Sequence, residues 1–194
     1  MGTRHLICVV LDGEYKVAQY GQWDGYLRGT GTDILNFLHK WNKEEFIKNL
    51  KTTKFITDEQ VDKHYVECGA TPGEEWINNE VDKGIKSKYP SLSRDTGGNI
   101  LYLIEHSKNI ELINRIDFAA DSLFCEWCYV IDLDKNTFEI YKGFNKKPLL
   151  KEERFSSLKV KADPGYFPVK HLITFNLDRL PSKETFNKIE VYEE

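Results

Sequence analysis

The residues best suited to binding or catalysis gather in two short stretches near the start of the chain. The first is Thr3-Arg4-His5, and the second runs from Gln19 to Tyr26 with the sequence QYGQWDGY. An imidazole can donate or accept a proton near neutral pH, and the rings of Tyr20 and Trp23 have flat faces with a polar edge. Asp24 can accept hydrogen bonds from a ligand or orient the histidine. These residue types predict a site for a small polar ligand.

A β-hairpin brings the two stretches together. Asp12-Gly13 is a strong two-residue turn signal between the apolar segment Arg4–Leu11 and the segment Glu14–Gln22. A type I′ turn there pairs His5 with Tyr20 and places Thr3 and Gln22 on the same face, with Arg4 on the opposite face. A second interpretation is purely structural: the tryptophan and Tyr26 close the core, and Asp24-Gly25 is only a turn.

Arg94, in a loop far along the chain, is a further candidate residue for this site. Ser93-Arg94-Asp95-Thr96-Gly97-Gly98 precedes an apolar segment typical of a helix, and a helix start rich in glycine can hold an anion. The loop lacks the Lys-Ser/Thr pair of a P-loop, so a simple capping role is the alternative. Arg94 would reach the site if the loop folds back on the hairpin. The predicted ligand-binding residues are Thr3, Arg4, His5, Tyr20, Gln22, Trp23, Asp24, Tyr26 and Arg94.

The pair Cys125-Glu-Trp-Cys128 has the spacing of a metal or redox motif. It lies in a strand pattern, where residues three apart face opposite sides, and no second ligand pair accompanies it. We therefore expect structural thiols, no metal site and no cofactor.

The order of the expected elements predicts the fold class. After the hairpin come helices near residues 34–41, after the capping boxes Thr57-Asp-Glu-Gln60 and Thr71-Pro-Gly-Glu74, and over Thr96–His106. Strands over Leu123–Leu133, Thr137–Tyr141 and Phe167–Leu177 follow, and a short helix over Ser182–Ile189. No βαβ alternation appears, so we expect an α+β fold with an antiparallel or mixed sheet. The prediction is one domain over 1–194, with a helical insertion at about 32–108.

Composition narrows the function classes. The chain has 194 residues and a net charge of −4, which disfavours nucleic acid as the main partner. No apolar run approaches the roughly 18 residues of a membrane span, and no signal-peptide pattern opens the chain. We expect a cytoplasmic protein with free thiols and no membrane partner. Assembly into a homo-oligomer is left open.

The opening MGTRHLICVVLDGEYKVAQYGQWDGY resembles a family of small uncharacterised proteins scattered among bacteria, their viruses and some fungi. Looser likeness extends to YPSLSRDTGGNIL and FCEWCYVIDLDKNTFEIYKGF. In the family pattern Pro-Ser-Gly-Gln-Gly follows the tyrosine, where this chain has Leu27-Arg28-Gly29-Thr30-Gly31. The resemblance implies no particular activity. Its distribution suggests that a viral member would sequester a nucleotide-derived signal, with Arg4 and Arg94 as phosphate partners.

The order of elements is also similar to that of the N-terminal-nucleophile hydrolases, which insert helices between strands. Their nucleophile is an exposed terminal Cys, Ser or Thr. Here removal of Met1 would expose Gly2, and Thr3 would become terminal only after further trimming. The leading prediction is therefore a non-catalytic or weakly catalytic domain that binds a small polar ligand. The alternatives are an amide-cleaving hydrolase of this type and a protein-interaction module, which an exposed aromatic patch at Trp23 and Tyr26 would favour.

Overall fold

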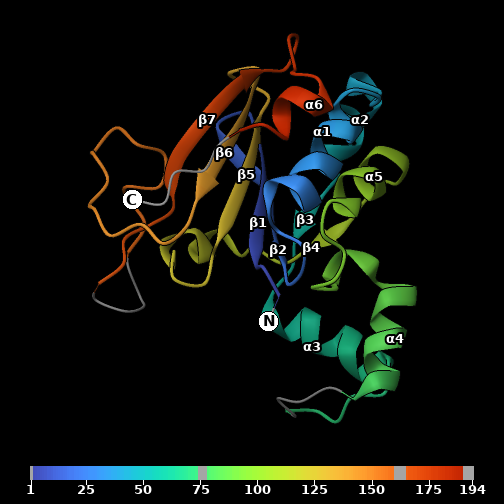
Figure 1. Ribbon diagram of the computed structural model, residues 1–194. Coiled ribbons are helices and arrows are strands. Elements are labelled where there is room, and N and C mark those ends of the chain that lie inside the picture. Colours follow the sequence, from blue (N-terminus) through green and yellow to red (C-terminus); the bar gives the residue numbers. More distant parts are fainter. Residues whose placement is uncertain (1, 74–77, 160–164, 190–194) are drawn as a thin grey trace.

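A computed structural model of the chain describes residues 2–73, 78–159 and 165–189 (Figure 1). Its main feature is a five-stranded sheet with the strand order β2-β1-β5-β6-β7. The strands are β1 His5–Leu11, β2 Glu14–Gly21, β5 Trp127–Asp132, β6 Thr137–Lys142 and β7 Lys170–Asn176. β1 and β5 are parallel and the other neighbours are antiparallel. The predicted α+β class and mixed sheet are confirmed.

The N-terminal hairpin forms as predicted, but its register differs from the expected one. Asp12 and Gly13 have φ angles of 57° and 75°, as a type I′ turn requires, and Leu11 pairs with Glu14. A β-bulge next to Val9 then shifts the pairing by one residue. Because side chains alternate along a strand, the shift moves the far end of β2 to the other face.

The shift changes which predicted site residues are neighbours. Gly21, not Tyr20, lies opposite His5, and Tyr20 lies opposite Leu6. The prediction that His5 and Tyr20 share a face is therefore wrong. Tyr20 instead shares a face with Arg4.

Helices cover one face of the sheet and irregular segments cover the other. Ile7, Val9, Tyr129 and Ile140 point into a large core beneath the helices. Those helices are α1 Thr32–Leu38, α2 Lys43–Leu50, α5 Asn99–His106 and α6 Lys183–Phe186, with the helical turn η1 Leu27–Gly31 before α1. The opposite face packs against the 3₁₀ turn η3 Ile116–Ala120 and against Phe155 and Val169.

A buried ion network holds the segment after β6 on that second face. Arg154 lies 2.5 Å from Asp132 and 2.8 Å from Glu139, and both carboxylates are buried. The hydroxyl of Tyr141 donates to Glu139 at 2.6 Å. The guanidinium is thus held by groups from two neighbouring strands.

A small helical unit lies beyond the end of the sheet where β1 begins (Figure 1). It consists of α3 Asp58–Glu67 and α4 Asn79–Lys88, followed by the turn η2 Pro90–Leu92. The short parallel strands β3 Lys54–Phe55 and β4 Glu111–Leu112 join it to the rest of the chain. It has its own small core around Ile56, Val81, Ile85 and Leu92. Figure 1 shows α3 and α4 apart from the helices that cover the sheet. The candidate site lies between this helical unit and β2.

The predicted helix starts have mixed outcomes. The capping box of Thr57 and Gln60 is present and opens α3. The predicted start at Thr71 is wrong, because Gly73 has a φ of +77° and Asn78 caps α4 instead. Glu74, the last residue of that predicted capping box, lies outside the described residues. α5 begins after Gly98 without a side-chain cap, and α2 was not predicted at all. Among the described helices, none has the length and apolar character needed to cross a bilayer.

Candidate functional site

An open cavity of about 800 Å³ lies between the outer edge of β2 and the α3–α4 unit. Its wall on the sheet side contains Gln19 and Tyr20 of β2, together with Arg94 and Arg115 from two loops. Its other wall is formed largely by α3, and apolar side chains of the helical unit lie between the two. This volume falls within the range of ordinary small-molecule sites.

Two arginines give the sheet-side wall its charge. Arg94 and Arg115 are both exposed. Within residues 2–73, 78–159 and 165–189, neither guanidinium forms a hydrogen bond or an ion pair. Arg115 is fixed by its backbone, whose N–H donates to the carbonyl of Ala18 in β2 at 3.1 Å. Both side chains therefore offer planar donors suited to phosphate or carboxylate.

Two tyrosines lie beside these cations. Burial raises the pKa of Tyr20, and the positive charges of Arg4 and Arg94 act in the opposite direction. Burial and the charge of Asp82 raise the pKa of Tyr65, while Arg94 and Arg115 oppose the shift. Both hydroxyls therefore stay protonated at neutral pH and can donate hydrogen bonds. Arg94 is close enough to act on both.

Tyr20 is held in place by its neighbours. Its hydroxyl donates to Oε1 of Gln22 at 2.5 Å. Its ring meets Phe118 of η3 edge-on, with centroids 5.0 Å apart. The hydroxyl is thus fixed at the edge of the sheet.

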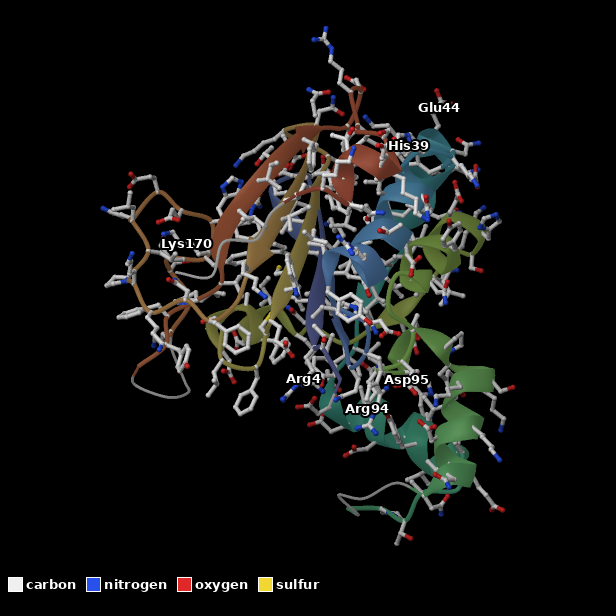
Figure 2. The ribbon with its side chains drawn as sticks, in the orientation of Figure 1. Arg4, His39, Glu44, Arg94, Asp95 and Lys170 are labelled. Atoms are coloured by element: carbon white, nitrogen blue, oxygen red, sulfur yellow. The ribbon has the colours of Figure 1, made fainter. Side chains whose placement is uncertain are left out.

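The loop that carries Arg94 is tied to the hairpin. The N–H of Gln22 donates to the carbonyl of Arg94 at 3.0 Å, and the side-chain amide of Gln19 donates to the carbonyl of Ser93 at 3.3 Å. Asp95 accepts from the indole N–H of Trp23 at 2.9 Å and pairs with Lys86 of α4 at 2.5 Å. The loop does fold back on the hairpin, which is the condition on which the prediction for Arg94 depended. Figure 2 shows Arg4, Arg94 and Asp95 gathered at this end of the sheet.

Arg4 lies near Tyr20 but is not among the residues that line the cavity. Its guanidinium stacks over the ring of Phe124, 4.5 Å from the centroid, and its backbone N–H donates to Glu126 at 3.2 Å. The Nε atom is buried and has no hydrogen-bond partner among the described residues. The charge of Arg4 favours the ionised form of Tyr20, which does line the cavity.

His5 lies outside the cavity, within the protein. It is fully buried, and neither ring nitrogen has a hydrogen-bond partner in the described parts of the chain. Burial lowers its pKa to about 4, while the backbone of Thr3 and the carboxylate of Asp24 weakly oppose the shift. The ring is packed against Gly21 and Gly25. His5 is therefore neutral near pH 7 and is shielded from ligands in solution.

The loop after β2 carries the remaining predicted residues. Trp23 and Tyr26 are 50% and 44% exposed, and the Tyr26 hydroxyl donates to Asp24 at 2.9 Å. The carbonyl of Thr3 accepts from the N–H of Gly25 at 2.9 Å. These side chains form a polar and aromatic rim on the helical side of the sheet, separate from the cavity.

The structure thus divides the predicted site. Tyr20 and Arg94 line the cavity, with Gln22 and Arg4 directly beside Tyr20. The predicted residues that do not line it are Thr3, Arg4, His5, Gln22, Trp23, Asp24 and Tyr26. Sequence reasoning missed Arg115 and Tyr65, which belong to different elements and share no spacing pattern. The capping box of α3 locates the helix of Tyr65, yet nothing in the sequence shows that this helix faces β2.

Cys125 and Cys128 are both fully buried in the hydrophobic core. Cys125 and Cys128 both pack into the same core as Cys8, because Cys125 precedes β5 and escapes the strand alternation. The expectation that they face opposite sides is therefore wrong. Burial raises the pKa of both thiols well above its ordinary value.

Across the described ranges, no group of three or more His, Cys, Asp or Glu side chains is placed to hold a metal ion.

Comparisons of this chain with protein-family models, with curated proteins and with solved structures gave no match. The functional argument therefore depends on the residues of the cavity themselves.

Proposed function

We propose that this chain binds a small anionic ligand in the cavity between β2 and the α3–α4 unit. The observation that carries the proposal is the pair Arg94 and Arg115, which line one cavity and whose guanidiniums form no hydrogen bond or ion pair among the described residues. A charged group without a partner in a concave site is a natural contact for an ion of opposite charge.

The two carboxylates nearest the arginines pair with a lysine rather than with an arginine, although the charge of Arg94 also helps to lower the pKa of Asp95. Asp82 and Asp95 both pair with Lys86, at 2.6 and 2.5 Å. Asp82, Asp95 and Lys86 together carry a net charge of one negative unit. Asp95 also accepts a hydrogen bond from the indole N–H of Trp23. The arginines can therefore contact a phosphate or carboxylate, with the hydroxyl of Tyr65 as a further donor; the proton of the Tyr20 hydroxyl is already donated to Gln22.

Calorimetric titration with inorganic pyrophosphate at low ionic strength tests the proposal. The probe is small, multiply charged and able to contact both arginines. We expect binding that weakens by about tenfold or more in Arg94→Gln and in Arg115→Gln, since charge-assisted hydrogen bonds contribute about 1.5–3 kcal/mol each. Arg179→Gln removes a guanidinium after β7 and serves as the matched control. No binding, or equal loss in all three variants, would rule the proposal out.

A second candidate function is protein interaction through the aromatic rim. Phe124 and Phe144, which are 41% and 46% exposed, lie at the same end of the sheet as Trp23 and Tyr26. Exposed aromatic side chains grouped at one end favour a contact surface. Sedimentation velocity over a range of concentrations tests self-association: a dimer that is lost in Trp23→Ser supports this function, and a monomer at all concentrations argues against a second copy as the partner.

A further inference from the structure

The cavity has two chemically different walls, and the difference narrows the class of ligand. The wall on the β2 side has the cations Arg94 and Arg115. The wall formed by α3 contributes three carboxylates and one cation, Glu59, Asp62, Glu67 and Lys63. Glu67 accepts a hydrogen bond from the hydroxyl of Tyr89 at 2.5 Å. A ligand that spans the cavity must therefore be an anion at one end and a hydrogen-bond donor at the other.

Asp62 is the free acceptor on the α3 wall. Glu59 is engaged by its own helix start, where the Thr57 hydroxyl and a backbone N–H lower its pKa. Asp62 is exposed and forms no hydrogen bond or ion pair in the part of the chain that the structure describes. A carboxylate has two acceptor oxygens, so two adjacent N–H groups satisfy it best.

Part of the cavity lining between the two walls is apolar. Ile85, Leu92 and Ile113 line it, and the half-buried ring of Tyr65 lies beside them. Such a surface favours a flat, weakly polar body that can pack against an aromatic ring. A sugar phosphate alone would leave this surface unused, and a fatty acid would offer nothing to Asp62.

We infer that the ligand is a nucleoside phosphate whose base bears two adjacent N–H donors, as guanine does. The inference rests on the proposed anion site, because the phosphate would contact Arg94 and Arg115. The base would lie along Tyr65 and donate its N1–H and exocyclic amine to Asp62.

Four probes separate the parts of this inference: guanosine 5′-monophosphate, inosine 5′-monophosphate, ribose 5-phosphate and guanosine. The first two differ only in the exocyclic amine. We expect the guanine nucleotide to bind about tenfold or more tightly than ribose 5-phosphate, and several-fold more tightly than the inosine nucleotide. Asp62→Asn should remove the preference for guanine over inosine and leave ribose 5-phosphate binding unchanged. Asp58→Asn, on the same helix but outside the cavity, is the matched control.

The outcomes distinguish the two proposals. If pyrophosphate binds through the arginines but the guanine nucleotide binds no more tightly than ribose 5-phosphate, the inference about the base is overturned and the anion site stands. If Asp62→Asn leaves the preference for the amine intact, the assignment of Asp62 is wrong. If none of the phosphates binds, both proposals fall.

Discussion

The imidazole of His5 lies directly against Gly21, its partner across the β1–β2 ladder. A Cβ atom at Gly21 would come within 2.2 Å of both Cε1 and Nε2 of His5. We expect Gly21→Ala to lower the free energy of unfolding by about 1–3 kcal/mol, since the ring has no space to move into. Urea denaturation measures the loss. The same change in a His5→Ala background should cost clearly less; an equal cost would show that the histidine is not what excludes the methyl group.

Burial of His5 also predicts a dependence of stability on pH. The pKa of His5 is about 4 in the folded chain, below its ordinary value of 6.5. Between these values the unfolded chain binds the proton and the folded chain does not. Stability is therefore retained above pH 6.5 and lost as the pH falls towards 4, by up to about 3 kcal/mol. Denaturation at pH 7 and pH 4.5 checks this, and His5→Gln should show a smaller decrease. An identical decrease in both proteins would assign the effect to other groups.

The ion network of Arg154 predicts a large effect of a single substitution. Arg154→Met would leave Asp132 and Glu139 buried without their cation. Removing one partner of a buried charge pair typically costs about 3–5 kcal/mol. Thermal or chemical denaturation measures it, with Arg179→Met as an exposed control expected to change stability by about 0.5 kcal/mol or less. The network contributes little if the two variants prove equally stable.

The cysteines should differ in reactivity. Cys8, Cys125 and Cys128 are fully buried, and burial raises the pKa of Cys125 and Cys128. Cys68, at the end of α3, is partly exposed. Iodoacetamide at pH 8 should therefore label Cys68 first and the other three only after denaturation. Peptide mass spectrometry identifies the labelled sites, and early labelling of Cys125 would contradict the packing described above.

The sequence predicted the fold well where the signal was local. The Asp12-Gly13 turn and the Thr57 capping box depend on neighbouring residues, and both are present. The bulge beside Val9 and the cap at Asn78 were missed. A bulge depends on how both faces of a strand pack. A capping pattern at Thr71 competes with a second potential cap nearby, and the sequence does not rank the two.

The site was predicted only in part, for a related reason. Tyr20 and Arg94 were found because each lies in a short motif with polar or glycine neighbours. Arg115 reaches the cavity because its backbone binds Ala18. Such a contact between distant segments has no sequence signature. The register shift caused by the bulge also places His5 and Tyr20 on opposite faces of the sheet, so the two residues cannot belong to one site.

The parallel pairing of β1 with β5 has a consequence for how the chain is made. During synthesis the β1–β2 hairpin is complete well before β5, whose Trp127 pairs with His5, has been made. Until then β1 presents an unpaired edge of apolar residues, which is prone to aggregate. Long-range pairing of this kind also slows folding. During synthesis the edge of β1 therefore stays open to pairing with other chains until β5 is made.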